Sequence, residues 1–278
     1  MKNILIILFL ILQLSTVRAQ YPNPLPSSGP LDVQTIYNWM QAAGENPGSY
    51  SISGMNSKSH LLDKTAPYSL SDWYGYSNCY SFTVTHMITD GAPEQKTVTY
   101  GSVLYNNQCW ITQNLGATNA APSSSAYDEP TSGWYWQFNR KQGYKHNGLT
   151  RTPATAWINT LDNTGPGYGW APSKDPCALL LKSGWRLPTM TEWQVLSQST
   201  AWQYIDAAFN TPLRIYTAGK LAGLTGTLLN RNSPYIAFFW SSTGYPTTYG
   251  YQYSVGTAVY SAMSGSNTAD AYPLRCVK

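Results

Sequence analysis

Few residues in this chain have the chemistry of a catalytic site. The histidines and glutamates are His60, His86, His146, Glu45, Glu94, Glu129 and Glu192. In SFTVTHMIT, His86 shares the apolar face with Phe82, Val84 and Ile88, which predicts a structural histidine on the inner face of a strand. Glu192 follows Thr189 at capping-box spacing, which explains that glutamate without catalysis. No G-x-S-x-G, H-E-x-x-H or phosphate-loop motif occurs. We therefore predict that the protein is not an enzyme.

The cysteines point to disulfide bonds rather than to a metal. Cys79, Cys109, Cys177 and Cys276 form an even set, and no C-x-x-C or H-x-x-x-H spacing is present. Zinc sites normally show such spacing, so we predict no metal site and no cofactor. Three pairings of four cysteines are possible. We favour Cys79–Cys109 and Cys177–Cys276, because the second bond would tie the last strand to the middle of the domain.

Residues 1–19 are typical of a secretory signal peptide. Lys2 precedes an apolar run over residues 4–14, and Val17 and Ala19 offer a cleavage site before Gln20. That run is too short to span a bilayer, and no later stretch is long enough to do so. No cysteine follows the run to carry a lipid anchor. The prediction is a secreted protein, extracellular or on the cell surface, where disulfides persist.

The composition is rich in aromatic residues and poor in charge. The chain of 278 residues has 11 Trp, 22 Tyr and 6 Phe, and only 11% of its residues are charged. So many aromatic residues can build a large core, which argues against whole-chain disorder. A formal net charge of +4, without a basic block, predicts no nucleic-acid partner.

The pattern along the chain predicts an α+β fold with antiparallel sheets. Helices are expected after an N-cap at Asp32, after the Thr189 capping box, and over residues 202–209. Strands are expected over residues 81–89, 96–104, 109–115, 236–241, 249–255, 258–263 and 272–277. Strands before helices, and strands again after them, are typical of the α+β class.

Six motifs between residues 98 and 278 resemble the Fibrobacter succinogenes major paralogous domain of secreted bacterial proteins. They are CWITQNLGA (109–117), GWYWQFNRKQGYKH (133–146), DPC (175–177), GWRLPTMTEW (184–193), FWSST (239–243) and LRCVK (274–278). The resemblance implies a C-type-lectin-like domain with two helices and a twisted antiparallel sheet. It also places Trp110, Trp185, Trp193 and Trp240 in motifs expected to form the core.

This resemblance completes the expected domain organisation. Residues 20–78 would form a Pro-rich leader and a small N-terminal module, residues 79–101 connecting strands, and residues 102–278 the lectin-like domain. Calcium-dependent sugar sites of C-type lectins carry a W-N-D motif. Here Trp240 is followed by Ser241 and Ser242, which supply no carboxylate, so we expect no calcium at that position.

The tyrosines of the last third are the predicted ligand contacts. The candidates are Tyr245, Tyr249, Tyr251, Tyr253, Tyr260 and Asn267, interleaved with Ser, Thr and Gly. Tyrosine offers large contact area at low entropic cost, and small polar residues offer adaptable hydrogen bonds. The alternative is that alternate tyrosines simply pack the sheet. Residues 241–270 also share the composition of lectin-like domains diversified by retroelements.

The sequence thus predicts a non-enzymatic module at the cell surface or secreted, which binds a glycan or a protein surface. The alternative is a structural or assembly component of a surface or phage-like apparatus, docked through the N-terminal module.

Overall fold

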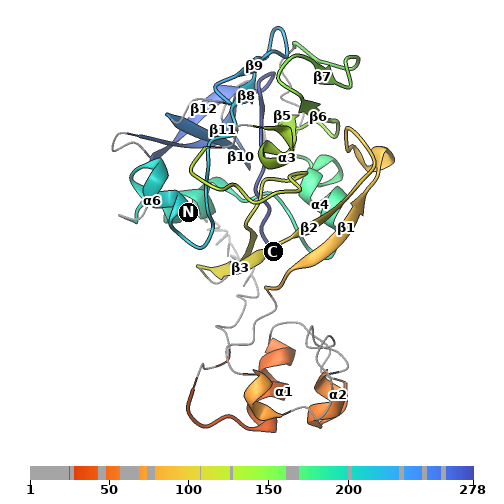
Figure 1. Ribbon diagram of the computed structural model, residues 1–278, viewed down its shortest axis with the longest axis vertical. Helices are drawn as coiled ribbons and strands as arrows, with labels where there is room; N and C mark the ends of the chain where they lie inside the picture. The colour runs from red at the N-terminus through yellow and green to blue at the C-terminus, as the bar shows by residue number, and fades with distance from the viewer. Residues whose placement is uncertain are drawn as a thin grey trace, which may run out of the picture. The chain divides into compact units, whose positions relative to one another are not determined.

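The chain divides into two compact units, Met1–Tyr74 and Gly75–Lys278 (Figure 1). The computed structural model describes residues 25, 28–42, 48–56, 69–73, 79–106, 108–125, 128–160, 169–199, 202–231, 235–245, 249–257 and 261–278. The predicted signal peptide lies outside these residues. None of the described helices combines the length and apolar character needed to cross a membrane.

The first unit is a small helical module. Its described elements are α1 (Val33–Ala42), α2 (Ile52–Asn56) and the 3-10 helix η2 (Leu70–Trp73). The carboxylate of Asp32 accepts the backbone N–H of Thr35 at 2.6 Å, so the predicted N-cap is present. Ile36, Trp39 and Met40 lie on one face of α1 and are buried. The module therefore has an apolar core of its own.

The second unit mixes short helices with antiparallel strands, which confirms the α+β class. Its helices are η3 (Ile88–Asp90), α3 (Glu129–Ser132), η5 (Pro172–Lys174), α4 (Pro176–Leu181), α5 (Met190–Ser197) and α6 (Ile205–Phe209). Its strands are β1 (Phe82–His86), β2 (Lys96–Tyr100), β3 (Ser102–Tyr105), β4 (Gln108–Ile111), β5 (Tyr135–Gln137), β6 (Gly143–His146), β7 (Arg151–Thr152), β8 (Lys220–Leu221), β9 (Leu228–Leu229), β10 (Ile236–Gly244), β11 (Tyr249–Gly256), β12 (Ser261–Asn267) and β13 (Ala271–Tyr272).

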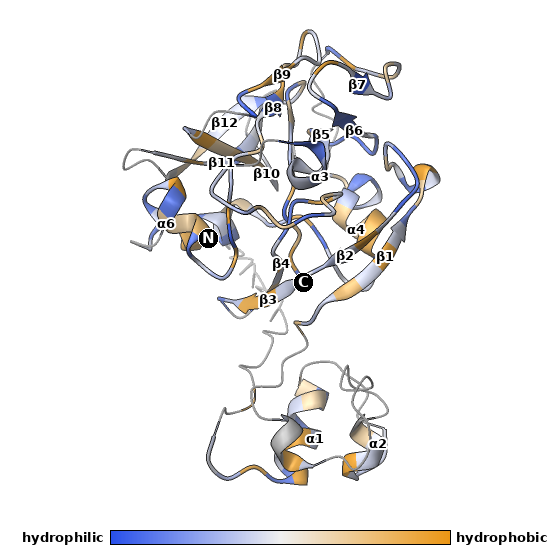
Figure 2. Cartoon of the chain, in the orientation of Figure 1, coloured by the Kyte–Doolittle hydropathy of each residue, from blue (hydrophilic) through white to orange (hydrophobic). Residues whose placement is uncertain are grey.

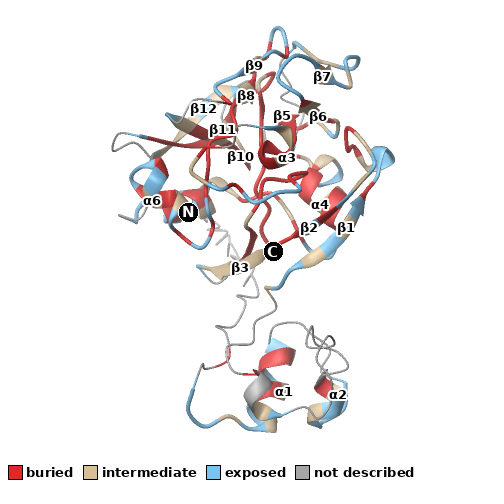
Figure 3. Ribbon diagram, viewed as in Figure 1, coloured by how far each residue is buried: buried red, intermediate tan, exposed pale blue. Residues whose placement is uncertain are grey.

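These strands form two hairpins and two larger sheets. The hairpins are β1–β2 and β3–β4, and the sheets have the orders β10-β11-β12 and β7-β6-β5-β13-β8-β9. All the pairs of strands are antiparallel. Buried residues run along β10, β11 and α4 through the middle of the unit, whereas the outer side of β1 is exposed (Figure 3).

The four tryptophans predicted to form the core, Trp110, Trp185, Trp193 and Trp240, are buried. Trp240 belongs to a cluster around Trp134, Trp136 and Tyr272. Trp110 and Trp193 belong to a second cluster with Trp202, Phe239 and Tyr253, and Trp185 is buried in the first. Among the largest fully buried side chains of the described residues, all but Arg275 are Trp or Tyr, which fits the composition of the chain.

Helix α5 starts at the predicted capping box. The Thr189 hydroxyl accepts the Glu192 N–H at 3.2 Å, and the Glu192 carboxylate accepts the Thr189 N–H at 2.7 Å. Arg186 also binds both carboxylate oxygens of Glu192, at 2.8 and 2.6 Å. Burial alone would raise the pKa of Glu192, but the hydrogen bonds from Arg186, Gln108 and Thr189 lower it to about 2. Glu192 therefore has a structural role in this helix.

The β1–β2 hairpin shows the predicted alternation. Thr83 and Thr85 face outward, and their hydroxyls hydrogen-bond to Thr99 and Thr97 at 2.8 Å each. The opposite face carries Phe82, Val84 and His86, and it packs with Val98 and Tyr100 on the first core cluster. The strands that we expected to be connectors thus pack into the core of the same unit as residues 102–278.

Some strands are shorter than predicted, for identifiable reasons. The expected strand 96–104 breaks at Gly101, where a Cβ atom would lie 2.7 Å from the Thr112 hydroxyl. The strand before Gly101, β2, pairs with β1, and the strand after it, β3, pairs with β4. The expected strand 272–277 ends at Tyr272, because Pro273 has no N–H to donate. Beyond it, Val277 pairs with Trp110 and Arg186 as isolated bridges.

The C-terminal segment, Leu274–Lys278, crosses the middle of the second unit. Its carbonyls at Leu274 and Cys276 accept the N–H groups of Leu115 and Ile111, and Lys278 exchanges two hydrogen bonds with Cys109. Both favoured disulfides, Cys79–Cys109 and Cys177–Cys276, are present. The second closes a separation of 99 residues, worth about 4–5 kcal/mol in the chain-entropy model.

Arg275 anchors this segment from inside the core. Its guanidinium is 1% exposed and donates to the Asn114 side chain at 2.9 Å. It also donates to the carbonyls of Ile111, Leu213 and Arg214 at 3.0, 2.9 and 2.9 Å. Burial lowers the pKa of Arg275 to about 10, so the group stays charged at neutral pH. The four acceptors replace the water that the cation has lost.

We expect Arg275→Met to lower the free energy of unfolding by at least about 3 kcal/mol, because each orphaned carbonyl costs about 1–3 kcal/mol. Urea denaturation of the variant and the wild type measures this difference. Lys141→Met, at an exposed position, is the control and should stay within about 0.5 kcal/mol of the wild type. A loss below 1 kcal/mol for Arg275→Met would show that the guanidinium is not an anchor.

Candidate functional site

The three-stranded sheet β10-β11-β12 carries most of the predicted ligand contacts. In the β11–β12 register Tyr249 lies opposite Asn267, Tyr251 opposite Gly265, and Tyr253 opposite Met263. Residues two apart on a strand point to the same face, so Tyr249, Tyr251 and Tyr253 share one face of β11.

Along β11 this face is exposed to solvent at Tyr249 and buried in the core at Tyr253. Tyr253 is fully buried, and its ring stacks on Trp193 with centroids 4.7 Å apart and an interplanar angle of 9°. The prediction of Tyr253 as a ligand contact is therefore wrong, because α5 covers this end of the strand and takes the ring into the second core cluster. Tyr260 lies outside the described residues.

The solvent end of the same face holds a group that we call the tyrosine surface, formed by Tyr245, Tyr249, Tyr251 and Asn267. The Tyr245 ring contacts those of Tyr251 and Tyr249, with centroids 4.9 and 6.4 Å apart. Tyr245 and Tyr249 are 37% and 44% exposed, and Asn267 is also exposed. The structure thus brings together four of the six predicted residues.

Two glycines position these rings. Tyr245 is folded back over β12 by a hydrogen bond from its N–H to the Tyr249 carbonyl at 3.0 Å. Its ring then lies where a Cβ atom at Gly265 would be 3.2 Å away. Gly250, on the other face of β11, lies where a Cβ atom would be 2.3 Å from Phe138. Neither glycine was predicted as a site residue, because the only signal in the sequence is a glycine inside a strand.

The tyrosine surface offers hydrogen bonds as well as apolar area. Within the described part of the chain, the hydroxyls of Tyr245, Tyr249 and Tyr251 have no partner. The Asn267 side-chain oxygen accepts the Ala269 N–H at 2.8 Å. The side-chain NH2 group of Asn267 has no acceptor among the described residues. Rings with polar tips beside an amide suit a ligand that has both apolar and hydroxyl groups.

The histidines lie in structural environments. His86 is buried, and its Nε2 atom hydrogen-bonds to the Tyr100 hydroxyl at 2.8 Å. Burial lowers the pKa of His86 to about 4. His146 is almost fully buried, with Nδ1 accepting the Gly148 N–H at 3.0 Å, and burial lowers its pKa as well. His60 lies outside the described residues.

Asp128 and Glu129 also have local roles. Asp128 caps α3, accepting the Thr131 N–H at 2.9 Å, and Glu129 is the first residue of that helix. Glu129 lies 3.9 Å from Lys96, which also lies 3.9 Å from Glu94. Among the described residues, no three His, Cys, Asp or Glu side chains gather as a metal site would require.

We compared the chain with protein-family models, with curated proteins and with solved structures, and none of the three comparisons found a match.

The neutral state of His86 predicts an acid-sensitive fold. The unfolded-state pKa is near 6.5 and the folded-state pKa is about 4, so between these values the unfolded chain binds the extra proton. The free energy of unfolding should therefore have its full value above pH 6.5 and fall by about 2–3 kcal/mol as the pH drops to 4. Urea denaturation at stepped pH measures this slope.

His86→Gln removes the titrating group and should flatten the slope, whereas His146→Gln is the matched control and should keep most of it. A His86→Gln variant with the same slope as the wild type would contradict the assignment.

Proposed function

We propose that this protein is a secreted or cell-surface, non-enzymatic binding module that contacts a glycan or protein ligand through the tyrosine surface. One observation carries the proposal: the Tyr245 ring contacts those of Tyr249 and Tyr251 on the solvent side of the sheet, while Tyr253 on the same face is held in the core. The proposed binding residues thus lie on a strand whose other end is held in the core.

The chemistry of the surface favours recognition. Exposed tyrosine rings stay in place because they pack on each other and on Gly265, so little rotamer entropy is lost on binding. Their apolar faces fit the C–H faces of a sugar ring or an apolar side chain, and their hydroxyls fit polar groups around it. No charge is needed for such a contact, which agrees with the low charge of the chain.

We further propose a C-type-lectin-like fold related to the Fibrobacter succinogenes major paralogous domain. The antiparallel β10-β11-β12 sheet, the helices α4 and α5, and a C-terminal segment bonded to the middle of the unit support this proposal. Two disulfides support an oxidising location outside the cytoplasm.

The second candidate is a structural or assembly component. The observation that favours it is the division of the chain at Tyr74, which leaves the first unit with a core of its own and free to act as a docking module.

Replacement of the surface tyrosines separates binding from folding. We expect Tyr249→Ala and Tyr251→Ala to weaken binding about tenfold or more, as hot-spot tyrosines do, without a change in stability above about 1 kcal/mol. Tyr253→Ala should instead lower the free energy of unfolding by about 3–5 kcal/mol. A glycan array read with each purified variant, and urea denaturation, measure the two effects.

The matched control is Tyr204→Ala, because Tyr204 is 43% exposed but lies beside α6 rather than on the tyrosine surface. Equal loss of array binding in this control and in Tyr249→Ala would contradict the proposed surface. Two results together would favour the assembly role. The protein would give no glycan signal, and it would co-purify with stable partners that Tyr249→Ala and Tyr251→Ala do not displace.

A further inference from the structure

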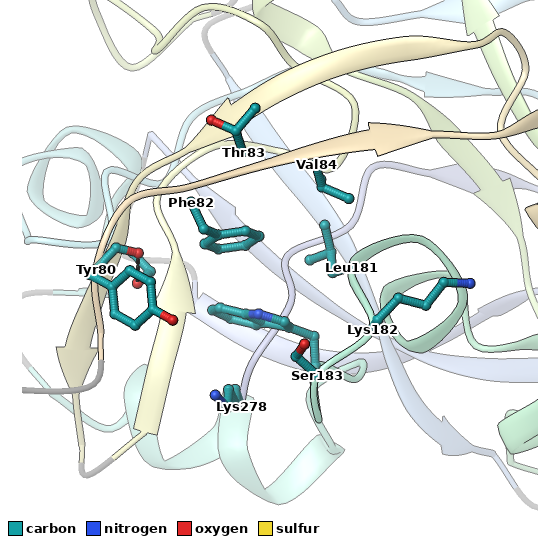
Figure 4. Close-up of a pocket in the computed structure, with 10 residues that line it drawn as sticks. Tyr80, Phe82, Thr83, Val84, Leu181, Lys182, Ser183 and Lys278 are labelled. Atoms are coloured by element: carbon teal, nitrogen blue, oxygen red, sulfur yellow. Dashed lines mark hydrogen bonds between the residues drawn. The ribbon is translucent and has the colours of Figure 1, made fainter. Parts of the chain in front are cut away.

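A second concave region lies on elements that the tyrosine surface does not use. A cavity of about 330 Å³ is lined by residues of β1, by Ser102 at the start of β3, by the end of α4 and the turn after it, and by Lys278. This volume is at the small end of the range for ligand pockets, so it suits a single ring rather than an extended chain. Figure 4 shows Phe82 and Leu181 on its inner side, with Lys182 and Lys278 toward its margin.

The inner wall of the cavity is apolar. Phe82 stacks on Trp185 with centroids 5.2 Å apart, and Val84 and Leu181 extend the wall. Figure 2 shows apolar residues concentrated on α4 and along β1, the two elements that meet here. Side chains with hydroxyl groups, from Tyr80, Ser102 and Ser183, also line the cavity, whereas the Thr83 hydroxyl is bonded to Thr99 on the outer face of the hairpin. Such a lining fits a ring with an apolar face and hydroxyl substituents.

The charged side chains of the lining are both lysines. Lys182 and Lys278 are its ionisable residues apart from Tyr80, and no Asp or Glu lines the cavity. Lys182 pairs with Asp90 at 3.0 Å in an exposed and therefore weak ion pair. The Lys278 ammonium has no partner among the described residues, although its stem lies over Gly184. A cation without a carboxylate beside an apolar wall favours an anionic ligand.

The backbone at this margin is strained. Lys182 has φ 59° and ψ −154°, a region that is essentially reserved for glycine. Ser183 follows with φ 46°, and its hydroxyl has no partner within the described residues. Glycine at position 182 would remove a strain of this kind. The strained turn brings the side chains of Lys182 and Ser183 to the same margin, where both line the cavity.

We propose that this cavity binds an acidic sugar residue, a six-membered ring that carries a carboxylate, as in a hexuronic acid. The apolar wall takes the C–H face of the ring, the hydroxyl-bearing residues meet its hydroxyls, and Lys278 and Lys182 meet its carboxylate. The site shares no residue with the tyrosine surface, so this proposal does not depend on the function proposed for that surface.

Ligand-observed NMR titration of the full chain tests this site with three probes: glucuronate, methyl glucoside and benzoate. We expect saturable binding of glucuronate, weaker binding of the neutral sugar, which lacks the carboxylate, and weaker binding of benzoate, which lacks the hydroxyls. Lys278→Gln should raise the Kd of glucuronate about fivefold, as the loss of one partly exposed ion pair predicts.

Lys182→Gly separates a binding role from a structural one. Relief of the backbone strain should raise the melting temperature, whereas loss of the ammonium should raise the Kd of glucuronate. Lys141→Gln and Tyr204→Ala, at exposed positions outside the lining, should leave that Kd unchanged.

Four results would overturn the proposal: no saturable binding of glucuronate, equal binding of methyl glucoside, tighter binding of benzoate than of glucuronate, or an unchanged Kd in both Lys278→Gln and Lys182→Gly.

Discussion

The hydrogen bonds of one buried guanidinium hold the second unit together. Arg275 carries a positive charge into the core, where no described carboxylate pairs with it, and a buried cation is tolerated only if its donors are satisfied. The oxygens that satisfy them come from β4, from Asn114 and from the segment at Leu213 and Arg214. These segments are far apart in sequence, so the charge constrains them to one arrangement around the C-terminal segment.

Both proposed binding regions depend on that arrangement. The C-terminal segment pairs with Arg186 through Val277 and with β4 through Cys276 and Lys278, and its last residue lines the cavity beside α4. On the other side, Arg275 lies over the ring of Phe239 in β10, the strand that pairs with β11. The core fixes the buried end of β11 at Tyr253, and the exposed end then carries the tyrosine surface.

The sequence predicts the elements that have local signals. The Thr189 capping box and the alternation in β1 both appear in the structure, since each depends on residue type and spacing. The favoured cysteine pairing, one of three possible, is also present. Periodicity also places the tyrosines of β11 on one face, but it cannot say where along the strand that face leaves the core. Tyr253 was misplaced for this reason, because its burial depends on α5, which is distant in sequence.

The cavity has no comparable sequence signal. Its lining comes from segments around residues 80–84, 102, 181–185 and 278, and Lys182 adopts a backbone conformation that no pattern of residue types would suggest. Short strands such as β5, β8 and β9 were also not predicted, since two or three residues show no periodicity. Tertiary contacts, rather than local preference, determine these parts of the fold.

Residue-resolved amide hydrogen exchange tests the central claim most directly, namely that the C-terminal segment is the anchor of the second unit. The amides of Ile111, Leu115, Val277 and Lys278 donate hydrogen bonds within this arrangement. The account predicts that they exchange only by global unfolding, with the full free energy measured by denaturation. Exchange of these four amides at the much lower opening free energy of the surface loops would contradict it.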